Sequence, residues 1–337
     1  PLGVQDLLKS HFFSILDKSN DHMKNEWTNM VNKIENAKGD VAKYIRYYWN
    51  SYHKHTREKE LFSEISELNN SDSILFLEGL FKNTEKYVSM INFKINGCYN
   101  AEIKDILKNL RDVGASSFYP LIFAVHRTNN DDRLLELLKA IESLIFRNQV
   151  IMKKTANTNE VFFCDQAFNL SSAKINVDEV IKNIINKTED DSTIESSFMK
   201  FSPNSTVART ILFDLFKYEN PGVSLVEYKV HLEHIMPQTK GLWDVDEEVW
   251  KIYNKRFGNM TLLYGIDNSK IKNKPYTEKR KIAYLDSKIP ETKQIALDHE
   301  YDWTSEDIDS RQSELFKRFI TRWKSNKKPD SKQSTII

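Results

Sequence analysis

Turn-forming residues are scarce in this sequence, and that scarcity limits the folds open to it. The 337 residues include only 9 glycines and 8 prolines. Folds built mainly from β-sheet need many tight turns, so the shortage favours helices. Hydrophobic residues make up 40% of the chain. This is enough for a real core, and the length suggests about two or three domains. We therefore expect a mainly α protein.

Helical periodicity runs through the first part of the chain. From Val4 to about Glu219, apolar residues recur at the spacing of one helix face. We expect residues 5–203 to form a helical linker or scaffold region and residues 204–324 to form a second domain. Residues 1–4 resemble the remnant of a purification tag, which makes the chain a fragment. Residues 325–337 are polar and lysine-rich, and we expect a disordered basic tail.

The pattern changes at Asn220-Pro221-Gly222, which signals a turn. From Val223 to Leu232 the apolar residues follow mostly a two-residue period, which predicts a strand. A second short strand is expected at Met260 to Tyr264. Helices are expected after Thr277 and after Ser305, so the second domain contains two strands packed with helices.

Charge and cysteine content exclude some classes of protein. The formal net charge is +1, so the chain as a whole has no strong attraction for nucleic acid. Cys98 and Cys164 lie far apart, which excludes a disulfide framework and a cysteine-rich zinc site. No apolar run is long enough to span a membrane, and no signal peptide opens the sequence. A reducing, cytoplasmic location fits these features best.

One segment carries chemistry: His231-Leu232-Glu233-His234-Ile235-Met236-Pro237-Gln238. If the first strand extends to His231, then His231 and Glu233 share one face and Leu232 points into the core. Phosphodiester hydrolysis needs a base that is neutral at pH 7 and a metal ion with oxygen ligands. His234 can be the base, and Glu233 with an asparagine can supply oxygen ligands. The asparagine candidates are Asn259 and Asn268.

The order of these residues resembles the HNH, or ββα-metal, nucleases. The segment from His231 to Gln238 is similar to that family's first strand, and Gly258-Asn259-Met260-Thr261-Leu262-Leu263 is similar to its second. The similarity is closer to the C-terminal HNH domain of GmrSD-type, modification-dependent restriction endonucleases. It extends over about residues 205–323 and includes the segment from Trp303 to Arg311. It is weaker over the helical region.

The resemblance implies a DNA endonuclease of a bacterial defence system against phage, with Mg²⁺ or Mn²⁺ as cofactor. It implies that His234 is the general base and that Glu233 and Asn268 bind the metal. Many HNH nucleases have Asp at the position of Glu233. The family's N-terminal ParB-like sensor domain is absent here, so we expect it upstream in the intact protein. Modified phage DNA is the implied target, and RNA is not excluded. The alternative is a helical DNA- or protein-binding module with a degenerate nuclease domain.

Three further assignments complete the predicted site. His231 either touches the metal or phosphate, or supports His234. Asn259 opens the second strand beside the first, and we expect its amide to orient His234 without binding metal. The six other histidines are expected to be structural or exposed. Seven basic and three acidic residues lie between Asp267 and Lys288. From these we predict the following contacts to the DNA backbone: Lys270, Lys272, Lys274, Lys279 and Arg280.

Overall fold

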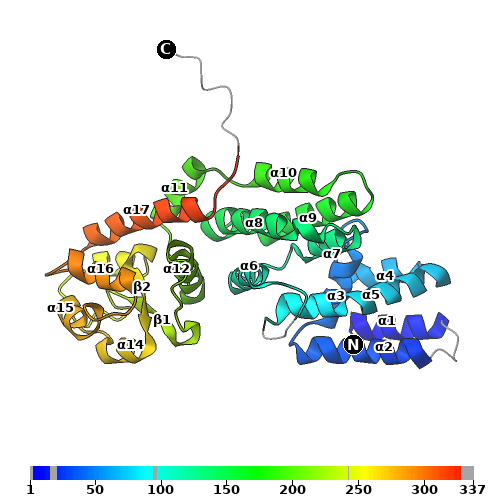
Figure 1. Ribbon diagram of the computed structural model, residues 1–337, viewed down its shortest axis with the longest axis horizontal. Coiled ribbons are helices and arrows are strands. Elements are labelled where there is room, and N and C mark those ends of the chain that lie inside the picture. The colour runs from blue at the N-terminus through cyan, green and yellow to red at the C-terminus, as the bar shows by residue number, and fades with distance from the viewer. Residues whose placement is uncertain (1–2, 16–20, 94–96, 242, 328–337) are drawn as a thin grey trace, which may run out of the picture. The chain divides into compact units, whose positions relative to one another are not determined.

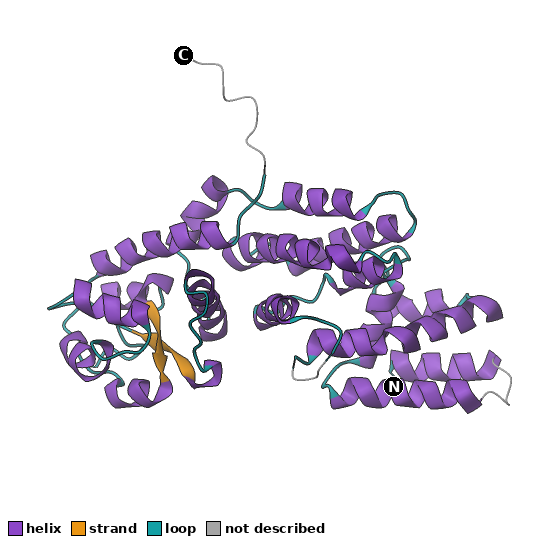
Figure 2. Cartoon of the chain, in the orientation of Figure 1, coloured by secondary structure: helices purple, strands orange, loops and turns teal. Residues whose placement is uncertain are grey.

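The computed structural model describes residues 3–15, 21–93, 97–241 and 243–327. The prediction of a mainly α fold is confirmed, because the described residues form helices and a single two-stranded sheet (Figures 1 and 2). The chain divides into two compact units. The first comprises residues 1–145 and 154–187, and the second comprises residues 146–153 and 188–337. Residues 1–2 and 328–337 of the expected tag remnant and tail lie outside the described residues.

The first unit is helical in its described part. Its elements are α1 (Val4–Ile15), α2 (Asp21–Asn36), α3 (Val41–Trp49), α4 (Glu58–Ser66), α5 (Asn70–Ile91), α6 (Ala101–Asp112), α7 (Tyr119–Arg127), η1 (Asp131–Arg133), α8 (Leu134–Leu144), α9 (Ala156–Ser171) and α10 (Val177–Lys187). Aromatic side chains fill much of its core, where the rings of Tyr44 and Tyr87 stack 4.7 Å apart. None of the helices within the described ranges is long and apolar enough to cross a membrane.

The second unit combines a β-hairpin with short helices. A π-helical turn, η2 (Ile145–Ile151), leads into it. Its other elements are α11 (Asp191–Met199), α12 (Ser205–Glu219), η3 (Glu227–Lys229), β1 (Val230–His234), α13 (Glu247–Tyr253), η4 (Phe257–Asn259), β2 (Met260–Tyr264), α14 (Gly265–Ile271), α15 (Tyr276–Lys279), η5 (Arg280–Tyr284), α16 (Pro290–Asp298) and α17 (Ser305–Arg322). Figure 1 shows β1 and β2 among α12, α14 and α16, and these helices contact the hairpin.

The hairpin is antiparallel, and His231 pairs with Leu263, Glu233 with Thr261, and His234 with Met260. The predicted strand at Met260 to Tyr264 is confirmed. The prediction for Val223 to Leu232 is wrong for most of its length, because β1 begins only at Val230. Residues 223–229 form a loop and the short helix η3 instead. Val223 and Tyr228 are exposed, so their alternation does not mark a buried face.

The second unit begins before the boundary that the sequence suggested between residues 203 and 204. Phe198 of α11 packs against Phe257, Phe316 and Phe319, with ring centroids 5.2–6.0 Å apart. Arg147 of η2 is fully buried in the same unit and donates to the carbonyl oxygens of Glu189 (2.7 Å) and Trp323 (2.6 Å). Residues assigned by sequence to the helical region therefore help to hold the hairpin unit together.

Candidate active site

Glu233, which the sequence predicts as a metal ligand, is buried. Its side chain is 5% exposed, and its Oε1 accepts hydrogen bonds from Lys279 Nζ and the Tyr284 hydroxyl, both at 2.7 Å. The expectation that Leu232 is the core-facing residue here is wrong. Leu232 is half-buried, and Glu233 lies in the interior because Lys279 and Tyr284 satisfy its charge.

Lys279 makes three hydrogen bonds at the end of β1. Besides Glu233, its ammonium donates to the carbonyl oxygens of His234 (2.8 Å) and Ile235 (3.1 Å). Three acceptors match the three N–H bonds of a protonated lysine, whereas a neutral amine has only two. Burial raises the pKa of Glu233, and Lys279 and Tyr284 oppose that shift. Burial lowers the pKa of Lys279, and Glu233 opposes it. We take the pair to be a carboxylate and an ammonium.

His234 ends β1 and is half-buried. The side-chain nitrogen of Gln238 lies 3.1 Å from its Nε2 and donates to it. Burial, and then the nearby charge of Lys279, lower the pKa of His234 to about 4. The imidazole is therefore neutral at pH 7, which is the form that can accept a proton from water.

Asn259 is fully buried, but its amide does not reach the imidazole of His234. Its Oδ1 accepts from the backbone N–H of Met236 (2.8 Å) and from Trp303 Nε1 (3.1 Å). Its Nδ2 donates to the carbonyls of Met236 (2.8 Å) and Asn254 (3.0 Å). The residue thus fixes the backbone two residues beyond His234, and any influence on the imidazole passes through that backbone.

Asn268 and His231 both make contacts between β1 and α14. Asn268 Nδ2 donates to the carbonyl of Leu232 at 3.0 Å. This hydrogen bond does not use the Oδ1 atom of Asn268. His231 is exposed, and its ring lies against Gly265. A Cβ at that position would come within 2.9 Å of His231 Nε2, so a larger residue there would displace the exposed imidazole.

The donor set can be tested for its fit to a divalent metal ion. Both side-chain hydrogen bonds of Glu233 go to Oε1, and no described side chain donates to its Oε2. That oxygen and Asn268 Oδ1 are hard donors of the kind that Mg²⁺ prefers. No cluster of three or more His, Cys, Asp or Glu side chains suited to a metal occurs in the described ranges. Two such oxygens would leave most positions around a bound Mg²⁺ ion to water, which this ion commonly retains.

Most of the residues predicted to contact the DNA backbone already have partners within the protein. Lys279 is 1% exposed and bonded internally, so its assignment as a phosphate contact has to be withdrawn. Lys270 pairs with Asp267 and Lys274 with Glu278, each at 2.8 Å. Arg280 Nε donates to the carbonyl of Ala296 at 2.7 Å. Within the described ranges, Lys272 is the member of the set that is exposed and forms no ion pair.

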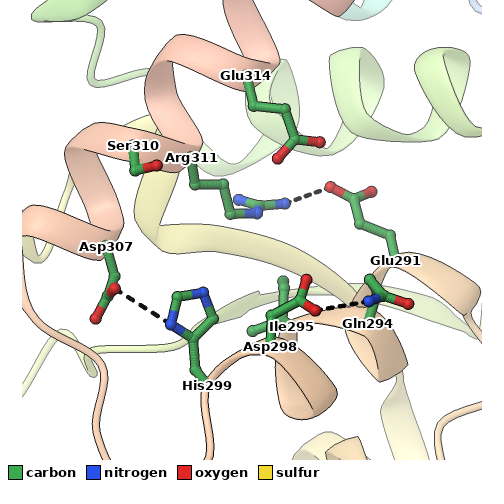
Figure 3. Close-up of a pocket in the computed structure, with 9 residues that line it drawn as sticks. All are labelled: Glu291, Gln294, Ile295, Asp298, His299, Asp307, Ser310, Arg311 and Glu314. Atoms are coloured by element: carbon green, nitrogen blue, oxygen red, sulfur yellow. Dashed lines mark hydrogen bonds and ion pairs between the residues drawn. The ribbon is translucent and has the colours of Figure 1, made fainter.

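A separate pocket lies between α16 and α17 (Figure 3). Four of its ionisable side chains form two pairs: Arg311 bonds to Glu291, and His299 Nδ1 lies 3.2 Å from Asp307. Arg311 also donates to the carbonyls of Gly258 (2.9 Å) and Met260 (2.6 Å), which flank Asn259 in the chain. These contacts make the pocket a support for the start of β2, and they leave few free groups for chemistry.

Sequence reasoning missed Tyr284 and Gln238 and misread Lys279. Lys279 directly precedes η5 and Tyr284 is its last residue, and the Leu285 N–H bonds there to the carbonyl of Arg280 five residues earlier. The apolar spacing used to predict helices assumes that each N–H bonds to the carbonyl four residues earlier. It therefore does not place Lys279 and Tyr284 on the same side of a helix. Gln238 could have been noticed, because it follows His234 by four residues in a segment that Pro237 forces to turn.

Residues 164–318 match the family model for the C-terminal domain of GmrSD restriction endonucleases. The matched region includes both strands and all the site residues described above. No curated protein matches the chain. This region of the chain is therefore similar to part of a restriction endonuclease, in agreement with the resemblance seen in the sequence motifs.

Proposed function

We propose that the second unit is a metal-dependent HNH endonuclease that hydrolyses phosphodiester bonds in DNA. The observation that carries this proposal is the geometry at the end of β1, where the half-buried imidazole of His234 follows Glu233, whose carboxylate is held by Lys279 and Tyr284. The match of residues 164–318 to a restriction-endonuclease domain supports the same reaction class. The proposed cellular role is restriction of phage DNA, with a ParB-like sensor domain elsewhere in the intact protein.

In the proposed reaction, His234 accepts a proton from a water molecule whose oxygen bonds to phosphorus. The bond between phosphorus and the leaving oxygen then breaks, and the leaving oxygen takes up a proton from solvent water. Glu233 and Asn268 would hold Mg²⁺ or Mn²⁺, which supplies positive charge to the phosphate and the leaving oxygen when bound. Asn259 keeps the chain after His234 in place through Met236. His231 is exposed beside the strand, where it can contact the substrate phosphate.

Plasmid nicking tests the proposal directly. Supercoiled plasmid is incubated with the protein in Mg²⁺, in Mn²⁺, and in either metal with excess chelator. We expect relaxed plasmid with metal and none with chelator. Equal cleavage in the presence of chelator would contradict metal dependence. No cleavage under any condition, by protein that is folded by circular dichroism, would contradict the nuclease assignment.

One observation favours the alternative of a binding module with a degenerate nuclease. The charge of Lys279 sits 2.7 Å from Glu233 and weakens the attraction of this carboxylate for a cation. A protein that binds labelled duplex DNA as well with chelator as with Mg²⁺, and never cuts it, would support this alternative.

A further inference from the structure

Lys279 joins three consecutive residues at the place where β1 ends. Its Nζ contacts Glu233 Oε1, the carbonyl of His234 and the carbonyl of Ile235, at 2.7, 2.8 and 3.1 Å. One ammonium can meet a side chain and the next two carbonyls only if the backbone curves around it. The direction in which the strand leaves the sheet, and with it the position of His234, is therefore tied to this one group.

A π-helical turn brings the two donors of Glu233 together. Lys279 and Tyr284 are five residues apart, and in a regular α-helix such residues point about 140° away from each other. In η5 the bonding pattern shifts to the fifth residue, which turns positions five apart toward the same side. Both side chains consequently reach Glu233 Oε1 from one segment. Such turns occur frequently at functional sites.

We propose that Lys279 is a positioning residue of the nuclease: with Tyr284 it fixes the strand end that presents His234 and orients Glu233, and it does not contact DNA. The inference rests on the proposed function. Burial removes Lys279 from any phosphate, since its side chain is 1% exposed. Stability alone is a weak reason for this arrangement, because buried ion pairs are often no more stabilising than apolar residues of similar volume.

Three lysine substitutions separate positioning from DNA contact: Lys279→Met, Lys272→Met and Lys255→Met. Lys272 is exposed in the basic segment, and Lys255 is an exposed control outside it. Affinity for a labelled duplex is measured in chelator, and the single-turnover cleavage rate is measured with Mn²⁺ at saturating DNA. For Lys279→Met we expect unchanged DNA affinity and a rate about 10–100-fold lower, as for partners of metal ligands. Lys272→Met should instead weaken DNA binding with little change in the saturating rate.

Tyr284→Phe is a second variant that tests the inference if Lys279→Met does not fold. It removes one hydrogen bond to Glu233 and keeps the buried ring. We expect a smaller fall in the saturating rate, again with unchanged DNA affinity. Weaker DNA binding with a parental saturating rate in Lys279→Met would overturn the inference. If Lys279→Met does not fold, a parental rate in Tyr284→Phe would overturn it.

An NMR measurement that does not depend on catalysis can test this inference separately from the proposed function. With ¹³C-labelled histidine, the ring resonances of His234 should shift in Lys279→Met, or in Tyr284→Phe, while those of the exposed His22 stay unchanged. If the parent protein does not cut DNA, this shift would still support the positioning role, and the nuclease assignment alone would fail. Unshifted His234 resonances in the folded variants would refute the positioning role, whatever the activity.

Discussion

At the scale of single residues, His234 combines partial burial with a neutral ring. Burial and Lys279 lower its pKa to about 4, so almost every molecule holds the imidazole unprotonated at pH 7. His234→Ala should reduce plasmid nicking by about 10²–10⁴-fold, the usual contribution of a general base. The folded structure should persist, because the side chain is only half-buried. His22→Ala is the matched control, since His22 is exposed on α2.

Asn259 should matter more for stability than its polar side chain suggests. Asn259→Ala leaves the backbone of Met236 and the indole of Trp303 without their buried partner. We expect a loss of about 1–3 kcal/mol in the free energy of unfolding, from denaturant titration. The folded fraction of the Asn259→Ala protein should cut DNA more slowly than the parent and bind Mn²⁺ with the same affinity. A selective loss of Mn²⁺ binding would make Asn259 a metal ligand. Asn273→Ala, at an exposed position, is the control.

The sequence was informative about the residues whose types the chemistry requires. Glu233, His234 and Asn259 could be grouped because their order resembles that of the HNH motif, and the structure places them around one strand end. Lys279 could not be identified in this way. A lysine in a basic segment is usually exposed, and only the tertiary contacts with Glu233 reveal that this one is buried.

At the scale of elements, Asp190 shows how a short helix depends on its cap. Its Oδ1 accepts from the Thr193 N–H (2.8 Å) and the Ser192 hydroxyl (2.9 Å) at the start of α11. Asp190→Ala should lower the free energy of unfolding by about 1 kcal/mol, whereas Asp190→Asn retains a good capping oxygen. Thermal unfolding of the three proteins at pH 7 checks this order.

The same cap predicts a pH dependence. The hydrogen bonds from Thr193, and then from Ser192, lower the pKa of Asp190 to about 2. In the unfolded chain the pKa of an aspartate is about 3.9. The charged side chain of Asp190 therefore stabilises the fold above pH 3.9, and this contribution is lost as the pH falls toward 2. The advantage of the parent over Asp190→Ala should therefore narrow below about pH 4. The advantage of Asp190→Asn over Asp190→Ala should not depend on pH through this group.

Strand and helix boundaries show where local pattern fails. The alternation from Val223 to Leu232 predicted too long a strand, because pairing with β2 limits β1 to Val230–His234. By contrast, α17 begins at Ser305 as expected, since Thr304 and Asp307 form reciprocal hydrogen bonds at its start. Local capping chemistry is visible in a sequence, whereas the length of a paired strand depends on its partner.

At the scale of the whole molecule, the two units are not simple consecutive stretches of sequence. Residues 146–153 belong with residues 188–337. The boundary that the sequence suggested between residues 203 and 204 separates Phe198 from its aromatic partners. Such a contact between distant segments leaves no periodic signal in either of them.

Truncation tests where the second unit begins. A fragment of residues 188–327 retains α11, and a fragment of residues 204–327 loses it. We expect the shorter fragment to unfold at a clearly lower temperature, because Phe198 and the bond from Gln312 Nε2 to its carbonyl (2.6 Å) are gone. Equal midpoints for the two fragments would place the boundary at residue 204 after all.

The buried guanidinium of Arg147 also sets an order of events during synthesis. Its acceptor, the carbonyl of Trp323, lies 176 residues further along the chain. At roughly 5–20 residues per second, a ribosome needs about 9–35 s to travel from one to the other. Until Trp323 is made the arginine lacks this partner, and Arg311, which bonds to the start of β2, is itself made only near the end of that interval. A nascent chain therefore cannot assemble the hairpin unit in its final form before Arg311 and Trp323 have both been synthesised.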